Sequence, residues 1–101
     1  MRLSSLISRL KKPLAVRRVR GESMLPVLQD GQLVLFSSLR RPRDADVVLA
    51  ARNNFDIVKR LHVDDRGYSL RGDNTHDSYD VYDVDVNSVQ ATLIYPARTK
   101  N

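Results

Sequence analysis

Ser23 is the side chain of this sequence best placed to act as a nucleophile. It lies in the segment 21–26 (GESMLP), where glycine and proline indicate an irregular connection rather than a regular helix or strand. A nucleophilic hydroxyl needs such exposure, together with a base that takes its proton. A serine beside glycine and proline also suits a turn or a helix cap, so this structural alternative stays open.

The candidate bases are His62, His76 and a lysine, because the chain has no cysteine. Lys59 is the lysine that lies inside an apolar stretch, residues 57–61 (IVKRL). Burial disfavours an ammonium ion, so an inward-facing Lys59 would have its pKa lowered from about 10.4 toward neutrality and could accept the serine proton. Alternatively, Lys59 extends to solvent and Arg60 faces inward or pairs with an aspartate, since strand alternation allows either arrangement.

A third polar segment contains Gly72, Asp73 and Asn74, followed by Ser78 and Asp80. Gly, Asp and Asn accept left-handed backbone geometry, so a solvated turn is the plain interpretation. Ser78 and Asp80 could also supply a hydroxyl and a carboxylate to a neighbouring strand.

Short strands are the elements that would position these side chains. Apolar and β-branched runs separated by Gly, Pro, Asn and Asp turns predict strands at 15–19, 32–37, 46–51, 55–63, 68–71 and 89–95. Residues 64–67 (DDRG) read as a hairpin connection. The fold class is therefore mainly β, as a small barrel or a folded sheet.

A basic leader, residues 1–14, precedes this core at 15–101. Its apolar residues share one face of a predicted helix, which Pro13 should end near Lys12: Leu3, Leu6, Ile7, Leu10 and Leu14. Two interpretations stay open. The helix packs on the domain or frays from it, or it lies as a basic amphipathic helix on an anionic membrane surface or a partner protein.

Positive charge is concentrated at the N-terminal end of the chain. The chain has 101 residues and a formal charge of +5, with seven basic and no acidic residues in 1–20. The remaining chain is slightly acidic, so a nucleic-acid partner is not expected. No cysteine and no run of 18 or more apolar residues occur, which excludes disulfides, thiolate chemistry and a transmembrane helix. We expect no cofactor, a cytoplasmic location, and no metal site, because His62 and His76 read as polar surface residues.

Taken together and in order, these segments resemble the signal peptidase I family, which shares its Ser/Lys architecture with the self-cleaving SOS-response repressors. The matching segments are GESMLP at 21–26, DGQLV at 30–34, DVV at 46–48, VKR at 58–60, and GDN at 72–74 with Ser78 and Asp80. The chain is most similar to small members such as the maturation proteases that trim a nickel superoxide dismutase precursor. The fold implied is a small β catalytic core with a short N-terminal helix.

The resemblance implies a catalytic pair. Ser23 would be the nucleophile, with its backbone N–H in the oxyanion hole, and Lys59 would be the general base. Ser78 would orient the Lys59 amine, and Asp80 would hold the segment Gly72-Asp73-Asn74, called the GDN segment below. Residues that would shape the nucleophile turn, or replace an oxyanion-hole serine in it, are Met24, Pro26 and Gly21.

The sequence also departs from the family pattern. Only 12 residues separate Lys59 from Gly72, which leaves no room for the second β domain of large members. The family box S-x-D-S-R reads SYDVY at 78–82, without its arginine. The anchor that precedes the serine box in large members is replaced by the leader.

The function expected from the sequence is a serine endopeptidase that removes a short, N-terminal segment from a precursor protein bound as an extended peptide. The alternative is an inactive peptidase-fold module that binds a protein or a membrane surface. Both alternatives allow peripheral membrane contact through residues 1–14.

Overall fold

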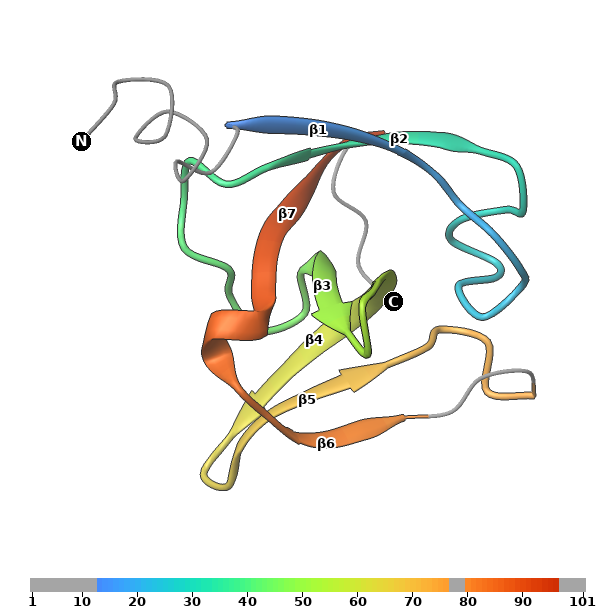
Figure 1. The fold of residues 1–101 in the computed structure, drawn as a ribbon. Helices are drawn as coiled ribbons and strands as arrows, with labels where there is room; N and C mark the ends of the chain where they lie inside the picture. Colours follow the sequence, from blue (N-terminus) through green and yellow to red (C-terminus); the bar gives the residue numbers. More distant parts are fainter. Residues whose placement is uncertain (1–12, 77–79, 97–101) are drawn as a thin grey trace, which may run out of the picture.

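The computed structural model describes residues 13–76 and 80–96, which form one antiparallel sheet of seven strands (Figure 1). The strands are β1 (Leu14–Arg18), β2 (Leu33–Ser37), β3 (Val47–Arg52), β4 (Phe55–Asp64), β5 (Gly67–Arg71), β6 (Val81–Val84) and β7 (Val89–Tyr95), with a 3-10 turn η1 (Val86–Ser88) before β7. Their order in the sheet is β1-β2-β7-β3-β4-β5-β6. The predicted mainly-β class is confirmed. Within the described ranges β1 and β6 do not pair, so the sheet is folded rather than closed into a barrel.

The predicted turns connect the central strands. Asn53 and Asn54 both have positive φ, 50° and 68°, and join β3 to β4 in a two-residue hairpin in which Arg52 pairs with Phe55. Asp64 pairs with Gly67 across the predicted hairpin between β4 and β5. These tight connections keep β3, β4 and β5 adjacent.

Two features of the sequence prediction were wrong. Strand β6 was not predicted, because it lies in an aspartate-rich segment where only Val81 is buried and Val84 is half-buried. Leu14 was placed on the helical face of the leader, but it begins β1. The rest of the predicted leader helix, residues 1–12, lies outside the described residues.

The core lies on both faces of β3. Val47 and Leu49 pack in one apolar cluster with Phe36, Met24 and Leu28. The alternate residues of β3 pack in a second cluster, whose members are Val48, Ala50, Leu61, Leu70, Val81 and Val89. Because neighbouring residues on a strand point to opposite faces, both faces of the central strands are covered. In the described part of the chain, no helix has the length and apolar character needed to cross a bilayer.

Candidate active site

Residues 21–28, called the nucleophile turn, lie in the connection between β1 and β2. Hydrogen bonds of their backbone groups fold this connection. Gly21 has φ +83°, a conformation that favours glycine, and its N–H donates to the Asp30 carboxylate at 2.8 Å. The Met24 carbonyl accepts from the N–H groups of Val27 and Leu28 at 2.9 and 3.0 Å. These bonds fold the segment into the irregular connection predicted around Ser23.

Apolar anchors hold the nucleophile turn on the core. Met24 is 1% exposed and Leu28 is fully buried, both in the cluster that contains Phe36. Ser23 lies between them and the solvent and is half-buried, while Pro26 is exposed. The burial of Met24 is consistent with its predicted role in shaping the turn, and it leaves Ser23 accessible.

The carbonyl and the N–H of Ser23 differ in their hydrogen bonding. Its carbonyl accepts a hydrogen bond from the Asn74 N–H at 2.8 Å. Its own N–H donates to no protein oxygen among the described residues. An N–H without a protein acceptor is what an oxyanion hole requires.

The GDN segment is clamped between β4 and the nucleophile turn. The Arg60 guanidinium donates to both carboxylate oxygens of Asp73, at 2.8 and 2.7 Å, and the two side chains are only 5% and 4% exposed. The Asn74 side-chain amide donates to the Glu22 carbonyl at 3.0 Å. The structure thus brings together the predicted residues Gly72, Asp73 and Asn74 with the turn that carries Ser23.

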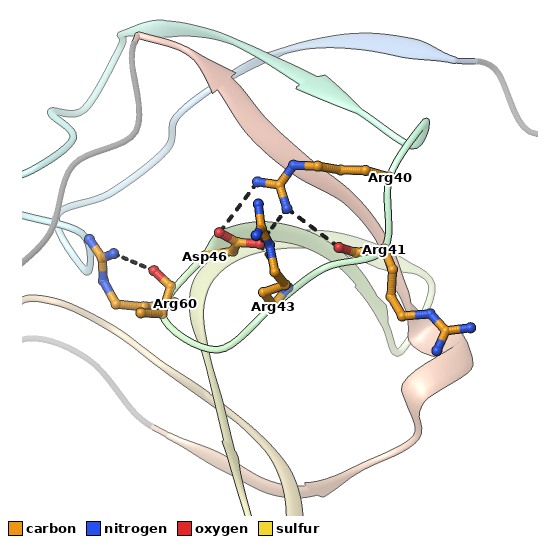
Figure 2. Close-up of polar contacts among 6 residues, drawn as sticks. Arg40, Arg41, Arg43, Asp46 and Arg60 are labelled. Atoms are coloured by element: carbon orange, nitrogen blue, oxygen red, sulfur yellow. Dashed lines mark hydrogen bonds and ion pairs between the residues drawn. The ribbon is translucent and has the colours of Figure 1, made fainter.

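The loop before β3 supports Arg60 from the other side (Figure 2). Arg60 Nη1 donates to the Ala45 carbonyl at 2.7 Å, and the Ala45 N–H donates to the Leu61 carbonyl at 2.8 Å. Asp46 is fully buried and accepts from Arg40 Nη1 at 3.2 Å and from the Arg43 N–H at 2.7 Å. Arg60 is therefore fixed by hydrogen bonds to both neighbouring segments.

Ser23 and Lys59 line the same cleft, of about 740 Å³. One wall runs from the end of β1 to Met24, the other is residues 56–59 of β4, and Leu49 lies at its base. Lys59 is 5% exposed, so the alternative in which its side chain extends to solvent is wrong. Arg60 is also buried, because both faces of β4 are covered.

Two features of the cleft go beyond the sequence prediction. His76, named above as a candidate base and then interpreted as a surface histidine, is exposed and lines the cleft. Arg17 of β1 and Asp56 of β4 also line it and form an ion pair at 3.2 Å between the two walls. No local sequence signal points to this ion pair, because it depends on how the sheet folds β1 toward β4.

Other predicted site residues lie elsewhere. Asp80 is exposed and accepts a long hydrogen bond, 3.4 Å, from the Tyr82 hydroxyl, so its predicted contact with the GDN segment stays a prediction. Ser78 lies outside the described residues. His62 does not line the cleft. In the ranges 13–76 and 80–96, no three His, Cys, Asp or Glu residues gather as a metal site would require.

Comparison with known families gives one match. A model of the Peptidase S24-like family matches residues 1–94, a range that includes the nucleophile turn, Lys59 and the GDN segment. No curated protein matches the chain significantly. The family match supports a serine peptidase-type function in general.

Proposed function

Because the chain belongs to the Peptidase S24-like family, we propose that it is an endopeptidase with a Ser/Lys dyad, in which Ser23 is the nucleophile and Lys59 the general base. The observation that carries this proposal is the shared cleft, which Ser23 and the buried Lys59 both line. Burial disfavours a charged amine, which supports the use of Lys59 as a base.

The reaction proceeds through an acyl-enzyme. Ser23 Oγ attacks the scissile carbonyl carbon while its proton passes to Lys59 Nζ, and the resulting ammonium returns that proton to the departing amine. The neutral amine then takes a proton from water, whose oxygen attacks the ester carbon. The bond from that carbon to Ser23 Oγ breaks, Oγ takes the proton back from Lys59, and the new carboxyl end is released. The backbone N–H of Ser23 stabilises the oxyanion in both steps.

Strand edges support an extended substrate in the cleft. β1 is the outermost strand of the sheet, and β5 pairs with β4 only from Arg60 onward, so the β5 side of residues 55–59 carries no strand in the described part of the chain. Both edges border the cleft. A peptide can add its main chain to such an edge and place its scissile bond beside Ser23.

The substrate we propose is a precursor protein that loses a short N-terminal segment, with small side chains before the cut. This specificity follows from the resemblance to signal peptidase I and to the maturation proteases. An inactive binding module remains the second candidate, motivated by the missing arginine in residues 78–82.

Comparison of protein N-termini in cells tests the proposal. Cells carrying the wild-type chain should contain new N-termini that are lost with Ser23→Ala and with Lys59→Met, each lowering cleavage about a thousandfold or more. Ser88→Ala is the matched control, because Ser88 is also half-buried but does not line the cleft. Unchanged N-termini in both dyad variants would favour the inactive module.

A further inference from the structure

The outer face of β1, β2 and β7 carries an apolar patch. Side chains that alternate with the buried Val34 and Phe36 point outward from β2, and those that alternate with Ala15 point outward from β1. The patch residues, with their exposed fractions where large, are Leu14 (50%), Val16 (61%), Leu33 (53%), Tyr95 (68%) and the half-buried Leu35.

Strand pairing makes these residues neighbours. Val16 pairs with Leu35, and Leu35 pairs with Tyr95, so the patch crosses three adjacent strands without interruption. Figure 1 shows β1 and β2 running together along one side of the molecule, with one end of β7 meeting β2 there. Exposed apolar side chains scattered singly are ordinary, whereas a contiguous group on one face marks an interaction surface.

The surroundings of the patch are positive. β1, β2 and β7 contain no acidic residue, and of their two arginines Arg17 is paired with Asp56 in the cleft, which leaves Arg18 to charge the patch. Arg18 pairs with Leu33 at one end of the patch. At the other end, the Ser38 N–H donates to the Pro13 carbonyl at 3.0 Å, which places the start of the described chain beside the loop that carries Leu39 and Arg41.

The loop that carries Leu39 and Arg41 adds an apolar side chain and a positive charge to the patch. Leu39 is 77% exposed, and Figure 2 shows the Arg41 side chain directed away from the Arg40–Asp46 pair. By contrast, seven aspartates fall within residues 64–85, the region of β5 and β6. The molecule is therefore polarised, with its apolar patch at the positive end.

We propose that the outer face of β1, β2 and β7 docks on an anionic phospholipid surface. Such a surface offers apolar acyl chains to the patch and negative head groups to Arg18 and Arg41. Pairing of this face with a second copy would bring like charges together, which opposes self-association. The proposal is independent of the Ser/Lys dyad, because none of the patch side chains is assigned to it.

Vesicle flotation of the full chain tests this docking. Wild-type protein should float with vesicles of equal phosphatidylcholine and phosphatidylglycerol in 150 mM salt, and not with pure phosphatidylcholine.

Val16→Ser/Tyr95→Ser should weaken binding about tenfold or more. Val86→Ser/Tyr82→Ser, which alters residues of similar exposure near the acidic region, should change it less than twofold. Arg18→Gln and Arg41→Gln should each cost about fivefold.

Several results would overturn the docking proposal. These are an absence of flotation, equal flotation with both kinds of vesicle, or equal losses in the patch and control variants. A dimer in sedimentation that Val16→Ser/Tyr95→Ser abolishes, without vesicle binding, would assign the face to a contact between copies instead. Ser23→Ala should bind vesicles as the wild type does, so failure of docking and failure of the proposed peptidase activity are separate results.

Discussion

Two ion pairs lie near the candidate site, and they differ in almost every physical respect. Arg60 and Asp73 meet through two short hydrogen bonds, with side chains 5% and 4% exposed. Arg17 and Asp56 meet at 3.2 Å with side chains 42% and 38% exposed. The first pair joins β4 to the GDN segment, which is bonded to the nucleophile turn, whereas the second joins β1 to β4 in the cleft.

This difference in burial gives the two ion pairs different strengths. Removing one partner of a buried pair leaves a desolvated charge and costs about 3–5 kcal/mol, while an exposed pair contributes about 0–1 kcal/mol. Arg60–Asp73 can therefore hold the GDN segment rigidly against Ser23 and Glu22. Arg17–Asp56 is weak enough to open when a peptide enters between the walls.

Asp73→Asn should give the largest change in stability. It leaves the Arg60 guanidinium buried opposite a neutral amide, so we expect the free energy of unfolding to fall by about 3 kcal/mol or more in urea titrations. The double variant Arg60→Met/Asp73→Leu removes both charges and should recover most of that loss. A loss below about 1 kcal/mol for Asp73→Asn would mean that the buried pair is no stronger than a surface one.

Asn74→Ala should have an intermediate effect. The substitution removes the hydrogen bond to the Glu22 carbonyl and the one that the Asn74 amide oxygen accepts from the His76 N–H, at 3.0 and 3.1 Å. We expect a loss of about 1–2 kcal/mol in the same titration and slower cleavage, because the turn at Ser23 is less firmly held. The neighbouring exposed residue gives the control, and Thr75→Ala should stay within about 0.5 kcal/mol of the wild type.

Arg17→Gln and Asp56→Asn should have the smallest effect on folding. Each should lower the free energy of unfolding by less than about 1 kcal/mol, and a double-mutant cycle should give a coupling energy in the same range. The coupling should shrink further at high salt, where exposed charges are screened. Coupling as large as that of Arg60 and Asp73 would remove the distinction between the two pairs.

Much of the sheet could be predicted because its turns carry strong local signals. Asn53-Asn54 and residues 64–67 mark hairpins through their backbone preferences, which act without tertiary contacts. Strand β6 gave no such signal. Aspartate, which flanks and enters this strand, is depleted in strands generally, and pairing with β5 together with packing of Val81 and Val84 in the second cluster fixes β6 there.

The candidate site could be predicted only in part. The segments around Ser23, Lys59 and Gly72 were found as sequence motifs, but strand alternation could not decide whether Lys59 or Arg60 is buried. Both are, because clusters on both faces of β3 and β4 leave neither face of the strand in solvent. The pairing of Arg60 with an aspartate was among the alternatives, but that the aspartate is Asp73 depends on how the GDN segment packs against β4.

Acylation of Ser23 is the measurement that tests the central claim most directly. The full chain would be treated with a p-nitrophenyl ester, with p-nitrophenolate release followed in time and the modified residue located by peptide mass mapping. The account predicts one acyl group on Ser23, formed rapidly in the wild type and in Ser88→Ala, and slowed about a hundredfold or more in Lys59→Met. Acylation at another residue, or equally fast acylation of Ser23 in Lys59→Met, would contradict it.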